Sequence, residues 1–399
     1  MSTKGKKLKK VLLAIGCTIL GLILILCIAI WCLWGNEIRS VASIKEIASN
    51  NPDHKDGYVY EMTIYGDYFF DDFLEQGGVS SDSELISFIT GNITKGIIPM
   101  NIGESEIACS SFTATTSDGD RVFGRNYDFK MTNTCIVHTN PGHGRHASVS
   151  TVDLEFISID NATGINGILD KILCLAAPYV PLDGMNDAGV SCGIYMTYQG
   201  QNTVATDQQT SKPDITSTTM LRMILDYADS VEEAIELVNK YDLHDSASTS
   251  YHYMVADATG KSAILEWIYD TDLTDNDGSK RVLKVTYNTD DAAMGTDAYQ
   301  CVTNFIVSPD YYNSDEDKLG FDRYEFLRTN LSSTNGIVAD DNAAMELLSG
   351  VGRRHWNNDD SNAITVHSVI YNLSDLTMIW VGNEHYGEDA YTVTYQLKK

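Results

Sequence analysis

The stretch ACSSFTATTSDGDRVFGRNYDF, residues 108–129, carries most of the information in this chain of 399 residues. It opens around Cys109 and places two runs of strand-forming residues on either side of an Asp-Gly turn, which predicts a β-hairpin. The returning strand bears Arg125 and Asp128. Because a hairpin brings its second strand back beside its first, we expect a thiol with a cation and a carboxylate next to it.

A nucleophilic thiol needs a base, and no histidine lies near Cys109 in the sequence. A cysteine at a new N-terminus supplies its own base, an α-amine with a pKa of about 7.7 to 8. Arg125 is expected to lower the pKa of the thiol from about 8.5 toward neutrality, and Asp128 to hold the amine. The residues leave one alternative open, in which Cys109 is a buried strand cysteine beside an ordinary ion pair.

The rest of the chain after residue 108 mixes strands with helices. Further hairpins are predicted at 253–267 and 364–381, each around a turn-forming pair. Apolar residues at helical spacing predict helices at 84–93, 218–227, 231–241, 321–331 and 341–348. Strands grouped with strands indicate an α+β layered fold and not a Rossmann-type alternation.

Residues 11–34 form an uncharged apolar run preceded by five lysines. The run is long enough to cross the roughly 30 Å hydrocarbon core of a bilayer, and longer than the apolar part of a cleaved signal peptide, which is the competing interpretation. We expect residues 1–10 to be a cytoplasmic basic tail and residues 11–34 a single-pass anchor in the cell membrane. Everything beyond is then extracytoplasmic. A lipid-modified Cys17 is a weaker alternative.

Charge and cysteine usage exclude other classes. The formal net charge is −27, from 55 acidic and 28 basic residues, which argues against a nucleic-acid partner because phosphates are bound by clustered Lys and Arg. Five of the eight cysteines lie beyond the anchor and lack the C-x-x-C spacing of a zinc site. We expect no metal and no cofactor, and the sequence leaves a disulfide pair open.

The segment from Cys109 resembles the opening of the choloylglycine hydrolase family, which includes bile salt hydrolases and penicillin V acylases and is related to acid ceramidase and N-acylethanolamine acid amidase. The shared elements are a nucleophilic cysteine, a DG turn and GRNxD. The resemblance continues in family order to the C-terminus through DGMNDAG at 183–189, MVAD at 254–257 with TGK at 259–261, VTN at 302–304, DRY at 322–324 and TVHSV at 365–369.

This resemblance implies a four-layer αββα N-terminal-nucleophile (Ntn) hydrolase fold over residues 109–399. It implies that Cys109 is the nucleophile, Arg125 the cation beside it and Asp128 the acid that orients the α-amine. Asn304 resembles the side-chain donor of the oxyanion hole, and Arg323 the second active-site arginine.

The sequence departs from the family pattern at two places. Met196 stands where bile salt hydrolases carry Asn, which weakens a bile-salt assignment; Tyr195 and Tyr127 are candidates to line the substrate pocket beside it. In addition, 108 residues precede the nucleophile. Residues 35–108 are therefore expected to be a stem or propeptide, cut off by attack of Cys109 on its own preceding peptide bond, and then either lost or docked as a separate subunit.

The resemblance therefore predicts an amidase that cleaves linear carbon-nitrogen bonds of a small acyl amide through a thioester on Cys109. Two alternatives remain: an acyltransferase of the same fold, and a catalytically silent, surface-anchored binding protein. The sequence leaves a homo-oligomer open.

Overall fold

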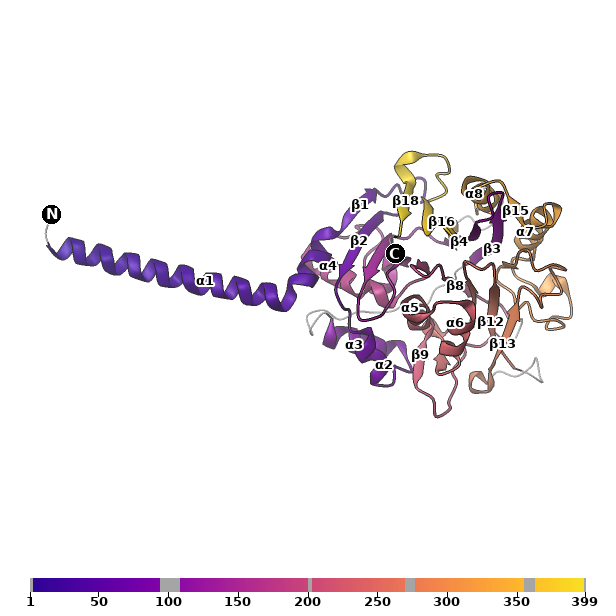
Figure 1. The fold of residues 1–399 in the computed structure, drawn as a ribbon, viewed down its shortest axis with the longest axis horizontal. Helices are drawn as coiled ribbons and strands as arrows, with labels where there is room; N and C mark the ends of the chain where they lie inside the picture. Colours follow the sequence, from indigo (N-terminus) through magenta and orange to yellow (C-terminus); the bar gives the residue numbers. More distant parts are fainter. Residues whose placement is uncertain (1–2, 94–107, 200–202, 270–276, 355–362, 398–399) are drawn as a thin grey trace.

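The structure, a computed structural model, describes residues 3–93, 108–199, 203–269, 277–354 and 363–397. A long N-terminal helix projects from a body built of two β-sheets and the helices that cover them (Figure 1). The part of the expected propeptide at 94–107 lies outside the described residues.

The projecting helix α1 spans Thr3–Ser43 and is broken at Trp34, which has φ −135° and ψ 17°. The stretch Lys10–Ser43 contains an 18-residue window with a mean hydropathy of 3.0 and is long and apolar enough to cross a membrane, a test that signal sequences also pass. Beyond the break, α1 packs on the body: the side-chain oxygens of Ser40 and Ser43 accept hydrogen bonds from the backbone of Tyr65 and Thr63, each at 2.9 Å.

The larger sheet has nine strands in the order β1-β2-β5-β6-β7-β8-β11-β12-β13. All neighbours are antiparallel except β2 and β5, which run parallel. Its strands are β1 Lys45–Ala48, β2 Val59–Tyr65, β5 Thr134–Asn140, β6 Ser148–Asp153, β7 Asp183–Asn186, β8 Ser191–Met196, β11 Tyr251–Ala256, β12 Ser262–Ile268 and β13 Val282–Tyr287.

The smaller sheet has seven strands in the order β14-β3-β4-β16-β17-β18, with β15 paired to β3. Its strands are β3 Ala108–Thr116, β4 Arg121–Phe129, β14 Cys301–Val302, β15 Ile337–Val338, β16 Ile364–Asn372, β17 Thr377–Gly382 and β18 Thr392–Gln396. A separate pair, β9 Asp214–Thr216 and β10 Asp242–His244, runs parallel.

The two sheets face each other, and helices cover their outer faces. Helices α5 Ser217–Tyr227 and α6 Val231–Val238 pack on the larger sheet, and α7 Phe321–Ser333 and α8 Asp341–Ser349 pack on the smaller one. The short α4 spans Ile168–Leu173. Central strands such as β11, β12 and β16 are buried along their whole length, because each sheet packs on the other sheet and on helices. This helix–sheet–sheet–helix stack agrees with the four layers that the family resemblance implies.

The predicted local elements are confirmed. The hairpins are β3–β4, β11–β12 and β16–β17, and the helices expected at 218–227, 321–331 and 341–348 are α5, α7 and α8. Helix α6 ends at Val238, three residues before its expected end. Ser230 caps it by accepting a hydrogen bond from the backbone N–H of Glu233 at 3.2 Å.

Residues 36–93, here called the N-terminal segment, are built into the body. The segment contributes β1 and β2 to the larger sheet, together with α2 Phe70–Glu75 and α3 Asp82–Asn92. Phe70 and Phe73 are fully buried and lie against the ring of Tyr179, at centroid distances of 5.6 and 5.8 Å. The helix expected at 84–93 is α3.

Candidate functional site

The hairpin register brings Cys109 and Arg125 together. Cys109 lies opposite Tyr127, and Ser111 lies opposite Arg125, so Cys109 and Arg125 are diagonal neighbours on the same face of the strand pair. A guanidinium nitrogen, Nη2, of Arg125 is 3.3 Å from the sulfur of Cys109. The predicted cation beside the thiol is therefore in place.

Arg125 is held from the facing sheet. It forms a buried ion pair with Asp183 of β7 and donates to the carbonyl oxygens of Leu182 and Ile194. Asp183 also accepts hydrogen bonds from His367 at 2.8 Å and from Tyr371 at 2.7 Å.

Burial alone would raise the pKa of the Asp183 carboxyl, but His367 and Arg125 beside it lower that pKa to about 2. Asp183 is therefore ionised at neutral pH and fixes the orientation of the guanidinium.

Asp128 lies on the opposite face of the hairpin, because it pairs with Ala108 in the register. Its carboxylate accepts from the hydroxyl of Thr365 at 2.7 Å and lies 3.2 Å from a guanidinium nitrogen of Arg323. Burial raises the pKa of Asp128, and the Arg323 cation opposes that rise. Asp128 therefore points away from the thiol, toward Arg323 and Thr365.

Arg323 and Asn304 hold the backbone of Cys109. Arg323 donates to the carbonyl oxygen of Cys109 at 2.8 Å and to Asn304 Oδ1 at 2.8 Å. Asn304 Oδ1 also accepts from the N–H of Cys109 at 3.1 Å. Gly320, which precedes α7, allows this approach: it has φ +74°, and a Cβ there would lie 2.6 Å from Arg323 Nη2.

The structure thus brings all five predicted catalytic residues together; Cys109, Arg125, Asp128, Asn304 and Arg323 are called the Cys109 cluster below. All five are buried. Arg125 contacts the thiol of Cys109, while Asn304 and Arg323 contact its backbone. Asp128 in turn contacts Arg323. Chemically, the cluster offers a nucleophile, a cation to stabilise its thiolate, and an acid beside the peptide that precedes it.

The ionisation of Cys109 differs from the sequence expectation. The thiol is completely buried, and burial raises its pKa, while Arg125 acts in the opposite direction. The expected net lowering toward neutrality is wrong for the intact chain, because loss of water around the sulfur outweighs the neighbouring cations, Arg125 first and Arg323 after it. All eight cysteines are free.

Asn304 is oriented by two donors. Since its Oδ1 accepts from Cys109 and Arg323, its amide nitrogen points the other way and donates to the carbonyl oxygen of Met196 at 2.7 Å. In the intact chain the side-chain N–H group predicted to serve an oxyanion is therefore engaged with Met196.

The three predicted substrate-binding residues occupy different surroundings. Tyr127 and Tyr195 are fully buried, and their hydroxyls donate to Asp153 at 2.9 Å and to Ser111 at 2.6 Å. Met196 ends β8 and is half-buried. Contact of any of the three with a substrate stays a prediction.

Sequence reasoning missed the residues that position the cluster. Asp183 contacts Arg125, and Thr365 contacts Asp128. His367 in turn contacts Asp183. All three open or lie within the stretches 183–189 and 365–369, which were matched to family motifs without a role being assigned. Their position inside those motifs was the available signal.

The chain matches a known family. The family model of the linear amide C-N hydrolases, choloylglycine hydrolase family, matches residues 109–303. The curated bile salt hydrolase/transferase of Clostridium perfringens is 25% identical over 169 residues, which are 40% of this chain and 47% of that protein. The match thus spans about half the length of this relative.

Solved structures also match this chain, at low sequence identity and with TM-scores below 0.5. A mutant of the conjugated bile acid hydrolase from Clostridium perfringens has a TM-score of 0.49 at 16% identity and covers 72% of this chain and 92% of its own. Penicillin V acylase from Agrobacterium tumefaciens has a TM-score of 0.40 at 13% identity, covering 69% and 83%. The Caenorhabditis elegans N-acylethanolamine-hydrolyzing acid amidase ortholog has a TM-score of 0.41 at 16% identity, covering 73% and 100%.

Proposed function

Because this chain belongs to the choloylglycine hydrolase family of linear amide C-N hydrolases, we propose that it hydrolyses a small acyl amide with Cys109 as the nucleophile. The contact of 3.3 Å between Arg125 and the sulfur of Cys109 carries the proposal. Asn304 and Arg323 support it, because they bond to the backbone of the same residue, and Asp128 supports it through its ion pair with Arg323.

The proposed reaction runs through a thioester. The Cys109 thiolate attacks the amide carbonyl carbon, the carbon-nitrogen bond breaks, and the leaving amine takes its proton from the α-ammonium of Cys109. Water then attacks the thioester carbon and gives a proton to the same α-amine, and the carbon-sulfur bond breaks to release the acid and the Cys109 thiolate. Once it is free of Met196, the amide nitrogen of Asn304 can donate to the developing oxyanion. No metal or cofactor is part of this scheme.

The α-amine must first be uncovered. Attack of the Cys109 sulfur on the carbonyl carbon of Ala108 would transfer the preceding chain from nitrogen to sulfur, and water would then cleave that thioester. The products are residues 1–108 and a catalytic domain that begins at Cys109. Asn304 Oδ1, which accepts from the backbone N–H of Cys109 at 3.1 Å, lies where it would accept from the new amine.

After cleavage the N-terminal segment would stay docked as a separate subunit. Strand β2 is hydrogen-bonded to β5 along seven residue pairs, and Phe70 and Phe73 are fully buried. Burying a Phe side chain contributes about 1.5 to 3 kcal/mol, so dissociation would be strongly unfavourable. The catalytic domain would then remain attached, through this segment, to α1.

Helix α1 is proposed to anchor the protein in the cell membrane through residues 11–34, with the catalytic domain extracytoplasmic. The excess of lysine before this run sets the orientation. The break at Trp34 supports the proposal, because it separates the projecting apolar part from the part that packs on β2.

The proposed acyl group is aromatic or aliphatic and not a hydroxylated steroid. Met196 offers flexible apolar packing, whereas an asparagine at this position would offer hydrogen bonds. Tyr198, whose backbone N–H donates to the carbonyl oxygen of Asn304 at 2.8 Å, is 42% exposed and supplies a further aromatic surface near the cluster.

Mass spectrometry of the N-termini of the purified protein tests the processing step. The wild type is expected to yield a fragment that begins at Cys109, and Cys109→Ala to remain one chain. Cys301→Ala is the matched control, since Cys301 is another buried cysteine of the same sheet. Full amidase activity in a chain still joined at Ala108–Cys109 would refute the mechanism.

A substrate panel tests the specificity. Phenoxyacetyl and medium-chain acyl amides are expected to show a higher kcat/KM than glycine- or taurine-conjugated bile acids. The curated relative is named a hydrolase/transferase, so each assay should also contain an acceptor amine. Acyl-amine product formed faster than free acid would favour the acyltransferase, and no turnover of any substrate would favour a silent binding protein.

A further inference from the structure

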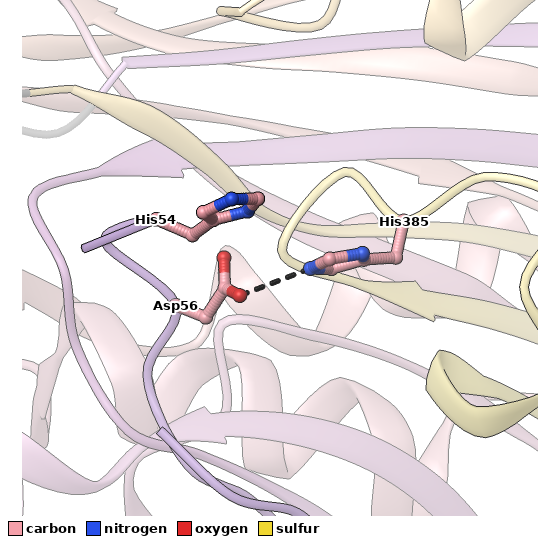
Figure 2. Close-up of side chains that lie close together, drawn as sticks. All are labelled: His54, Asp56 and His385. Carbon is pink, nitrogen blue, oxygen red and sulfur yellow. Dashed lines mark hydrogen bonds and ion pairs between the residues drawn. The ribbon is translucent and has the colours of Figure 1, made fainter. Parts of the chain in front are cut away.

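Three metal-ligating side chains meet where the N-terminal segment contacts the C-terminal part of the chain. His54 and Asp56 belong to the turn between β1 and β2, and His385 follows β17. One ligand atom from each lies within 4.8 Å of the other two. The two imidazole rings flank the carboxylate of Asp56 (Figure 2).

The hydrogen bonds of His385 present a conflict. Its Nε2 lies 3.0 Å from Asp56 Oδ2, and its Nδ1 lies 3.1 Å from Glu388 Oε1. A neutral imidazole carries one N–H and so can donate to only one of these carboxylates. A neutral ring therefore leaves one of the two contacts without a proton between its atoms.

A metal ion between Nε2 and Asp56 resolves the conflict. Nδ1–H would then donate to Glu388, which is the usual outer contact of a metal-bound histidine. Asp56 has the matching outer contact, because its other oxygen, Oδ1, accepts from Arg354 at 2.9 Å. The ring of Tyr391 stacks on His385 with centroids 3.7 Å apart and fixes its plane.

We propose that His54, Asp56 and His385 bind a divalent ion of the Zn²⁺ class. Two imidazole nitrogens and one carboxylate oxygen are a ligand set that Zn²⁺ prefers, with a fourth position left for water. This site lies outside the Cys109 cluster and takes no part in the proposed reaction, and it departs from the expectation that the chain holds no metal.

The three ligands differ in how far they must move. Zinc bonds of about 2.0 to 2.2 Å in a tetrahedron separate ligand atoms by roughly 3.3 to 3.5 Å. Asp56 and His385 are close to that spacing already, at 3.0 Å. His54 is exposed, and within the described part of the chain its ring nitrogens have no hydrogen-bond partner, so the ring is able to turn toward the ion.

The site would tie together parts of the chain on both sides of Cys109. His54 and Asp56 precede it and His385 follows it, so a bound ion would bridge the two fragments after cleavage. This consequence rests on the proposed processing. Binding of the ion does not, since all three ligands are present in the uncut chain.

Zinc titration tests the proposal on the full-length chain in detergent, carrying the Cys109→Ala substitution and a purification tag without histidines. This background keeps the chain intact and removes the Cys109 thiol, so the result is independent of the amidase proposal. The protein is stripped with a chelator and titrated with Zn²⁺ in competition with a chromogenic chelator. One equivalent is expected to bind with high affinity.

Variants locate the ion. His54→Ala and His385→Ala are each expected to weaken binding at least tenfold, and to abolish the rise in Tm that Zn²⁺ gives the parent protein. His143→Ala is the control, because His143 is another exposed histidine on a turn. His54→Ala removes an exposed ring and should fold normally.

The proposal would be overturned if His54→Ala bound Zn²⁺ as tightly as the parent protein does. It would also be overturned if the parent protein bound no Zn²⁺. N-terminal mass spectrometry of the protein without the Cys109→Ala substitution reports separately on the processing.

Discussion

Replacing Arg125 by Met tests whether its cation activates Cys109. The guanidinium nitrogen is 3.3 Å from the sulfur, and burial, which raises the thiol pKa, is opposed first by this cation. Met fills a similar volume without charge. We therefore expect Arg125→Met to fold but to form the thiolate far less readily.

The size of the effect follows from the distance. Unit charges 3.3 Å apart interact by about 5 kcal/mol at an effective dielectric constant of about 20. Water entering the site and rearrangement of side chains recover part of this energy. About 1.4 kcal/mol corresponds to a factor of ten in rate. If half to most of the charge interaction is lost, the reaction is therefore expected to be slower by about 10² to 10³.

The rate of cleavage between Ala108 and Cys109 measures this effect without knowledge of the substrate. The chain is synthesised in a cell-free system with detergent, and the appearance of the fragment 109–399 is followed over time. Arg121→Met is the matched control, because Arg121 lies on the same strand but contacts Thr115 and not the thiol.

A second variant guards against misfolding. Arg125→Met leaves the buried Asp183 without its ion pair, which can cost about 3 to 5 kcal/mol of stability. The double variant Arg125→Met with Asp183→Asn removes both charges and should regain stability without regaining rate. Cleavage within tenfold of wild type in either folded variant would refute the role of Arg125.

Four further outcomes are expected. Phe73→Ala, in the fully buried contact of the N-terminal segment, should lower the free energy of unfolding by about 3 to 5 kcal/mol in denaturant titrations. Burial raises the pKa of Asp153 to about 7, so between about pH 4 and about pH 7 the folded chain keeps a proton that the unfolded chain has released. The free energy of unfolding should therefore fall as pH rises from about 4 to about 7. Asp153→Asn should remove this pH dependence. The Tm of the variant minus that of the wild type should therefore increase between about pH 5 and about pH 8. Protease added to intact cells should digest a C-terminal tag, and a protected tag would reverse the proposed orientation. Met196→Asn should shift kcat/KM toward conjugated bile acids relative to phenoxyacetyl amides, and an unchanged ratio would remove Met196 from the pocket.

Much of the local structure was predictable from the sequence. The turn at Asp118-Gly119 and the runs of strand-forming residues on either side of it are local signals, so the β3–β4 hairpin and the proximity of Arg125 to Cys109 could be inferred directly. The helices were predictable for the same reason. Which face of the hairpin each residue occupies was not considered, although it separates Asp128 from the thiol.

The placement of Asn304 and Arg323 came from the family resemblance and not from spacing. They lie 195 and 214 positions from Cys109 along the chain. The local pattern around either residue contains nothing that points to a cysteine so far away. Only the pairing of β14 with β3 and the packing of α7 on that sheet bring them to one peptide.

The sequence by itself determined the hairpin, the apolar N-terminal run, the excess of acidic charge and the candidate nucleophile, because each depends on residues that are neighbours in the chain. The tertiary structure alone decided that the N-terminal segment belongs to the larger sheet, since β2 pairs in parallel with β5, about 75 residues further on. It also decided that the Cys109 thiol has a raised pKa and that Asp183 holds Arg125. Burial and contact between sheets arise only when distant segments pack, and they set the electrostatics of the site.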